Sequence, residues 1–130
     1  MTELTETIIF YTSVTNTITI DTVVNESQIW FTIKADKYDT DAESIIMISK
    51  GGGLLYLAGA ALVSPITSSD GSLSASTGNL VITLSPAASA LLTPTAVLVG
   101  EVKTKTAGGV VATIYNFDAK IIQTITNAIT

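Results

Sequence analysis

The stretch 29–50, IWFTIKADKYDTDAESIIMISK, constrains the fold most, because two apolar segments in it are joined by an acidic turn. From Ile29 to Lys34 the apolar side chains Ile29, Phe31 and Ile33 occupy alternate positions, which is the period of a β-strand with two different faces. A second, strongly apolar strand is expected from Ile45. Two strands that meet through such a turn predict a sheet at the centre of the protein.

Short segments with the same β-strand character recur along the chain. They cover residues 7–13, 15–23, 28–34, 45–50, 79–85, 95–106, 110–117 and 120–126. Seven or eight short strands without a long helix predict an all-β fold, an antiparallel immunoglobulin-like β-sandwich. With 130 residues, the chain is expected to form one domain, residues 1–130. Trp30, on a middle strand, is expected to anchor the core, as a tryptophan does in such sandwiches.

Two connections between strands have clear local signals. Ser85 followed by Pro86 predicts a helix N-cap and a first helical residue, and the alanines and leucines that follow favour one or two helical turns before Thr93-Pro94. This short helix is expected to carry the chain from one sheet to the other. Gly108-Gly109 lies between two alternating segments and predicts a β-hairpin. Gly100, inside the first of these segments, predicts a bulge or a close approach.

Residues 50–77 are rich in glycine, serine and alanine and predict a long loop between strands. A loop with this much apolar surface either folds back on the core or contacts a neighbouring subunit, and the sequence leaves both open. Its interface candidates are Leu54, Leu55, Tyr56, Leu57, Leu62 and Val63. Asp70-Gly71 is compatible with a small hairpin inside the loop. Gly51–Gly53 lacks the Lys-Ser/Thr pair that follows a phosphate-binding glycine loop.

The residue types that are missing argue against an enzyme and against any cofactor. The chain has no cysteine and no histidine, and its six basic residues are all lysine, so thiol, imidazole and guanidinium chemistry are absent. A net charge of −5 without a lysine cluster argues against nucleic-acid binding. The longest weakly polar run, residues 51–63, is too short and too rich in glycine to span a membrane. The opening MTELTETIIF does not resemble a secretory signal.

Four acidic residues, Asp36, Asp39, Asp41 and Glu43, lie in the turn between the two central strands. Carboxylates at alternate positions suit a calcium ion, but the glycine and the terminal glutamate of an EF-hand loop are missing. The favoured interpretation is a capped, water-exposed turn, in which Asp39 or Asp41 accepts hydrogen bonds from the backbone. Calcium binding at residues 36–43 stays an open alternative, and no catalytic or metal site is predicted.

The order of these features resembles the small β-sandwich modules in the virions of tailed bacteriophages, in particular the N-terminal domain of the baseplate upper protein. The resemblance covers residues 28–117. Its first part, D-x-D-A…I, is matched by Asp39, Asp41, Ala42 and Ile45. The second part is matched by Gly78, Leu80, Ile82, Leu84, Pro86, Ser89, Leu91 or Leu92, and Pro94. The chain departs from the family at residues 97–99, which are Val-Leu-Val instead of an aromatic strand, and at Thr95, which replaces a glycine.

The resemblance implies a non-enzymatic structural protein of a phage tail, baseplate or fibre attachment, present in several copies. Its partners would be other virion proteins and further copies of itself, and its location the virion, assembled in the host cytoplasm. A low charge content suits a subunit whose apolar loops and sheet edges are covered by neighbours. Two alternatives remain open: a capsid decoration protein, and a carbohydrate- or receptor-binding module that uses Trp30 or an exposed tyrosine.

Overall fold

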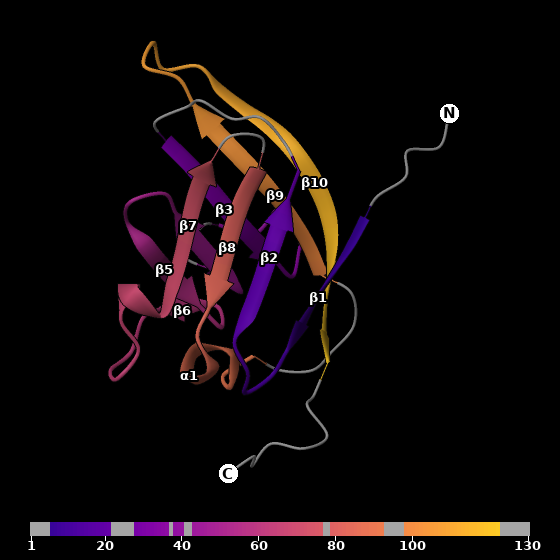
Figure 1. Cartoon of the computed structure of the whole chain (residues 1–130), viewed down its shortest axis with the longest axis vertical. Coiled ribbons are helices and arrows are strands. Elements are labelled where there is room, and N and C mark those ends of the chain that lie inside the picture. Colours follow the sequence, from indigo (N-terminus) through magenta and orange to yellow (C-terminus); the bar gives the residue numbers. More distant parts are fainter. Residues whose placement is uncertain are drawn as a thin grey trace.

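The computed structural model describes residues 6–21, 28–36, 38–40, 43–76, 79–92 and 98–122. Its strands are β1 (Glu6–Tyr11), β2 (Asn16–Ile20), β3 (Gln28–Lys34), β4 (Ile46–Ser49), β5 (Gly53–Leu57), β6 (Ala60–Ala61), β7 (Gly71–Ser76), β8 (Asn79–Leu84), β9 (Leu98–Lys105) and β10 (Val111–Ile122). They form a large sheet in the order β1-β10-β9-β3-β4-β5-β6 and a small sheet in the order β2-β8-β7. The two sheets lie in separate layers (Figure 1), which confirms the all-β prediction.

Strand β3 lies at the centre of the large sheet, as the sequence predicts. It pairs antiparallel with β9 on one side and with β4 on the other. Phe31 lies opposite Val102 and Ile48, and all three side chains are fully buried. The expectation that Trp30 anchors the core is wrong. Its side chain points to the other face of the sheet and is half-buried, because strand alternation gives the inward positions to Ile29 and Phe31.

The core between the sheets is built around aromatic rings of the large sheet. The ring of Phe31 stacks on that of Phe117 with centroids 5.1 Å apart, and Phe10 meets Phe31 edge-on at 6.1 Å. Leu80, Ile82 and Leu84 cover these rings from the small sheet and are almost completely buried. Alternate residues of β8 therefore face the core, as its sequence pattern predicts.

Gly100 makes a close approach inside β9, which is one of the two outcomes that its position predicts. It lies opposite Phe117 in the neighbouring strand, and a Cβ atom at this position would overlap the phenyl ring. The ring of Phe117 occupies the space that a side chain at residue 100 would need. Glycine here lets the aromatic ring lie flat against the strand.

The large sheet is not antiparallel throughout, so that part of the prediction is wrong. β1 pairs parallel with the second half of β10, from Glu6 opposite Phe117 to Tyr11 opposite Ile122. Alternation along a strand indicates which residues share a face, but not the direction of the neighbouring strand. The register places Ile8 and Phe10 over the core, while Ile9 and Tyr11 face outward.

The connection from the small sheet to the large one is the helix α1 (Pro86–Ser89), at the place the sequence predicts. The Ser85 side chain caps it by accepting a hydrogen bond from the Ala88 amide. The Ser85 hydroxyl also donates to a carboxylate oxygen of Asp70 at 2.8 Å. Asp70 Oδ2 also accepts the amide of Thr67, so this carboxylate links the start of η2 to the residue that follows β8. These bonds to Thr67 and Ser85 lower the pKa of Asp70.

The prediction of a long loop over residues 50–77 is wrong, and the predicted number of strands is therefore too low. This segment forms β5, β6, the short 3₁₀ helix η2 (Ser68–Asp70) and β7. Asp70-Gly71 does not close a hairpin, because Asp70 ends η2 and Gly71 begins β7. Gly53 has a positive φ of 72°, and a Cβ atom there would overlap the Ser68 carbonyl oxygen. Glycine at residue 53 thus allows the backbones at residues 53 and 68 to approach closely.

Several predicted features lie outside the described residues. They are the turn 25–27, Asp41, Ala42, Gly78, Pro94, Thr95, Val97, the end of the segment 15–23 and the end of the segment 120–126. The β9–β10 hairpin is described on both sides of its turn and is confirmed.

Candidate interaction surface

The large sheet has an outer face, on the side away from the small sheet. Strand pairing brings Tyr56, Met47, Thr32, Glu101 and Asn116 into one row across β5, β4, β3, β9 and β10. Met47 and Thr32 are buried although they lie on this face, with exposed fractions of 9% and 5%. The neighbouring long side chains on the sheet shield them.

Trp30 and Tyr56 are half-buried on the outer face, on strands that both neighbour β4. They come from segments that are separated in the sequence, so the sequence alone does not bring them together. Trp30 lies opposite Ser49 and Tyr56 opposite Met47. Ser49 and Met47 are on the same side of β4, two residues apart, so the two aromatic side chains share one part of this face.

A shallow hollow of about 260 Å³ lies on the outer face where β3, β9 and β10 run side by side. It is lined by Thr32, Lys34, Val99, Gly100, Glu101, Asn116, Phe117 and Asp118. The lining combines one lysine, two carboxylates, an amide and a hydroxyl with an apolar valine. Such a mixed surface suits contact with a polar partner.

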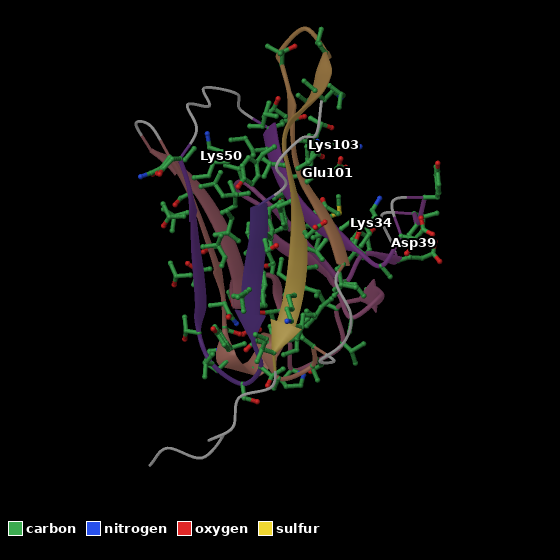
Figure 2. All side chains as sticks on the ribbon, turned by 90° about the vertical axis from the view of Figure 1, so that its right-hand side faces the viewer. Lys34, Asp39, Lys50, Glu101 and Lys103 are labelled. Atoms are coloured by element: carbon green, nitrogen blue, oxygen red, sulfur yellow. The ribbon has the colours of Figure 1, made fainter. Side chains whose placement is uncertain are left out.

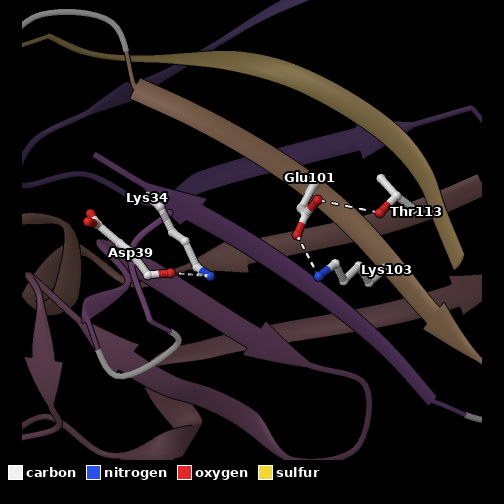
Figure 3. Close-up of polar contacts among 5 residues, drawn as sticks. All are labelled: Lys34, Asp39, Glu101, Lys103 and Thr113. Carbon is white, nitrogen blue, oxygen red and sulfur yellow. Dashed lines mark hydrogen bonds and ion pairs between the residues drawn. The ribbon is translucent and has the colours of Figure 1, made fainter. Parts of the chain in front are cut away.

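Glu101 ties the two strands of the hairpin together next to this hollow. One of its carboxylate oxygens lies 3.2 Å from Nζ of Lys103, and the other accepts a hydrogen bond from the Thr113 hydroxyl at 3.4 Å (Figure 3). Thr113 directly precedes a register shift in β10, after which Tyr115 lies opposite Val102. The contact therefore holds the hairpin in register where its regular pairing is interrupted.

The acidic turn between β3 and β4 uses its carboxylates to bind its own backbone. Asp36 Oδ1 accepts the Tyr38 amide, Asp39 Oδ2 accepts the Asp36 amide, and Glu43 Oε1 accepts the Thr40 amide and hydroxyl. The bonds from Thr40 lower the pKa of Glu43. The Lys34 ammonium closes the turn by donating to the Asp39 carbonyl at 3.0 Å (Figure 3).

This arrangement corresponds to the capped turn that the sequence favours. Within the described part of the chain, no three acidic side chains are grouped so that they would hold a metal ion. Asp41, one of the four acidic residues in the calcium alternative, lies outside the described residues.

The structure separates the six interface candidates of residues 50–77. Leu54 and Leu57 belong to the core, with exposed fractions of 1% and 5%. Leu55, Tyr56 and Leu62 are half-buried, and Leu62 packs against the core from its edge. Only Val63, of the six, is well exposed, at 72%. For Leu54 and Leu57, burial against the core is therefore the correct alternative.

A second open hollow, of about 470 Å³, lies beside Gly51–Gly53 and is lined mainly by glycine and serine of β4, β5, η2 and β7. It includes Ser49, Ser68, Ser69 and Ser72. These hydroxyls give it a polar, uncharged lining.

Exposed apolar side chains gather on the opposite flank of the large sheet, which the sequence does not single out. Those that lie on strands all belong, within the described residues, to β1, β9 and β10: Ile9, Tyr11, Val99, Val111 and Ile114. Val110 directly precedes β10 and is 63% exposed. We call these exposed apolar side chains of β1, β9 and β10 the apolar flank. In the sequence, the uncharged run Val110–Tyr115 is the feature that indicates this exposed apolar surface.

The protein is thus of the all-β class, with two facing sheets around one core. No protein-family model and no curated protein matches the sequence. Its fold is similar to that of a chain in a solved structure on T cell specificity and activation by the bacterial superantigen toxic shock syndrome toxin-1. The TM-score is 0.51 over 90% of this chain and 93% of the other, with 7% sequence identity, so the similarity concerns the fold alone.

No helix within the described ranges has the length and apolar character that crossing a membrane requires.

Proposed function

We propose that this protein is a non-enzymatic structural subunit of a bacteriophage virion, a component of the tail, baseplate or fibre attachment that contacts several neighbours. The observation that carries the proposal is the apolar flank. Val99 on β9 is 37% exposed, and Ile9 and Tyr11 on β1 are 39% and 45% exposed, with β10 between these two strands. Neighbouring subunits that cover such a surface remove it from water.

The proposal includes an immunoglobulin-like topology of the variable type. In that type, one sheet contains the strands G, F, C, C′ and C″ and the other contains B, E and D. The order β10-β9-β3-β4-β5 facing β2-β8-β7 supports this assignment. Phe31 would then take the inward position that a tryptophan occupies in antibody domains. The parallel β1 would be an additional strand beside G.

Mass spectrometry of purified phage particles tests the proposed function. The particles are those of the phage or prophage that encodes this chain. The expected result is a fixed number of copies of the protein in each tailed particle. Separating tails from heads before the measurement distinguishes a tail component from a capsid decoration protein. Particles that lack the protein, while the infected cell contains it, would disprove a role in the virion.

A carbohydrate- or receptor-binding module is the second candidate, and Trp30 and Tyr56 favour it. Both aromatic side chains lie on the outer face, on either side of β4, and sugar rings stack on aromatic platforms of this kind. Glycan-array binding that is lost in Trp30→Ala would favour this function. Glycan binding that Trp30→Ala leaves unchanged would show that Trp30 is not part of the glycan site.

A further inference from the structure

The β9–β10 hairpin ends in an arm, residues 105–114, that extends beyond the rest of the sandwich (Figure 2). Val110 and Val111 are 63% and 57% exposed, and Ile114 is 37% exposed. Within the described residues, β1 pairs with β10 only from Phe117 onward, so residues 111–116 have a strand neighbour on one side only. The arm is therefore an apolar element that no other described strand covers on its second side.

The most exposed aromatic side chain among the described residues lies at the other end of the same sheet. Tyr38 is 81% exposed and lies in the acidic turn that follows β3. β3 begins opposite Lys105, where the arm starts, and ends with Lys34, which binds the acidic turn. Six steps along a strand separate these positions by about 20 Å. An arm therefore cannot reach the Tyr38 turn of its own chain.

The two ends carry opposite local charge. Lys105 is the one charged residue in the segment 105–116, whereas the segment 36–43 contains four acidic residues and one lysine. The carboxylates of Asp36, Asp39 and Glu43 accept hydrogen bonds from backbone amides of the turn, which fixes the positions of these acidic side chains beside Tyr38 and Thr40. An apolar arm with a cation at its base is complementary to an exposed tyrosine in an acidic turn.

We propose that the arm of one copy docks on the Tyr38 turn of a second copy of this chain. Val110, Val111 and Ile114 would cover the tyrosine ring, and Lys105 would face the carboxylates. Because the two surfaces lie at opposite ends of the large sheet, the contact is head-to-tail and leaves a free arm and a free turn on every pair. Repetition of such a contact forms a ring or a filament. This inference deepens the proposed function, on which it rests, by assigning the contact between copies.

The contact is tested with two variants that break opposite halves of it. Val111→Asp places a negative charge on the arm, and Tyr38→Ser removes the aromatic ring from the turn. Both positions are well exposed, at 57% and 81%, so the fold is expected to tolerate the changes, which circular dichroism and thermal unfolding check. Val63→Asp is the matched control, because Val63 is equally apolar and exposed but lies in neither surface.

Sedimentation velocity over a range of concentrations gives the readout. The wild type and Val63→Asp are expected to sediment faster as concentration rises, and each broken variant alone is expected to remain monomeric. An equimolar mixture of the two broken variants should form dimers and nothing larger, because one intact arm meets one intact turn. Added salt should weaken the association of the wild type.

Three results would overturn the inference. One is a wild type that stays monomeric at every concentration, and another is a mixture of the broken variants that does not associate. The third is association of Tyr38→Ser alone as strong as that of the wild type, which would show contact between two arms. A monomeric wild type that is nevertheless found in fixed copy number in particles would remove this inference and leave the proposed function standing. If the protein associates in the expected pattern but is missing from particles, the proposed function is wrong and the contact between copies stands.

Discussion

The two halves of β10 have similar apolar and β-branched sequences but very different surroundings. In residues 117–122, Phe117, Ala119 and Ile121 are buried, and the strand has β9 and β1 as neighbours. In residues 111–116, Val111 is 57% exposed and, among the described strands, β9 alone pairs with this part. Figure 1 shows β10 continuing past the sandwich into the hairpin.

The comparison teaches that apolar character in a strand does not determine its burial. Phe117 is buried because its ring stacks on that of Phe31 in the core between the two sheets. Ile114 lies beyond this aromatic cluster, next to the register shift in β10. Stability is expected to depend on the covered half, and association with partners on the exposed half.

Phe117→Ala is expected to have the largest effect on stability. The substitution removes a buried ring that stacks on Phe31, and truncation of a buried phenylalanine costs about 3–5 kcal/mol of unfolding free energy. Urea unfolding followed by tryptophan fluorescence measures it, since Trp30 is the single tryptophan. A loss below about 1 kcal/mol would show that the covered half of β10 is not part of the core.

Gly100→Ala is expected to cost about 1–3 kcal/mol, because the new methyl group would overlap the ring of Phe117. Gly108→Ala is the control, since its Cβ atom would meet only the Thr106 hydroxyl, at 3.8 Å. The combination of Gly100→Ala with Phe117→Leu tests the cause. If the two losses simply add in a double-mutant cycle, the overlap with Phe117 is not the source of the first.

Asp70→Asn is expected to have a smaller effect that depends on pH. The bonds from Thr67 and Ser85 hold the pKa of Asp70 below its ordinary value of 3.8 in the folded protein. The ionised carboxylate therefore contributes stability above that value and loses it as pH falls through the lower pKa of the folded state. Wild type and Asp70→Asn should differ most near neutral pH and converge in acid.

Thermal unfolding at several pH values measures this difference. Ser85→Ala removes one of the two donors to Asp70, so the difference should be smaller in that background. A gap between the wild type and the Asp70→Asn variant that widens on acidification would contradict the assigned contacts.

Ile114→Ala is expected to have the smallest effect, within about 0.5 kcal/mol, because its side chain is largely outside the core. Urea unfolding under the conditions used for Phe117→Ala allows a direct comparison of the two halves. A loss of more than about 1.5 kcal/mol would place Ile114 in the core and remove the contrast between them.

The sequence predicts those parts of the fold that depend on local signals. The Ser85 cap, the hairpin at Gly108-Gly109 and the alternation in β8 are all read from neighbouring residues, and all are confirmed. The strands within residues 50–77 are not predicted, because small residues hide them and their positions depend on contacts such as that of Gly53 with Ser68. The parallel pairing of β1 depends on residues that are far apart in the sequence.

The candidate interaction surface is less predictable than the fold. The acidic turn is visible in the sequence, and its hydrogen bonds follow from the usual behaviour of aspartate in turns. Trp30 is misassigned, because alternation defines two faces without saying which one is covered. The apolar flank depends on which strands lie side by side in the large sheet, and this order is a property of the assembled sheet rather than of any one strand.

The partnership between β1 and β10 gives the protein a particular order of events during synthesis. Glu6–Tyr11 leaves the ribosome before every other strand of the sandwich but can complete its pairing only after residue 122 has been translated. Until then, Ile8 and Phe10 on the inward side of this segment are not covered by their final neighbours. Such exposed apolar side chains can bind chaperones or associate prematurely. Completion of the large sheet is thus coupled to translation of the chain through residue 122.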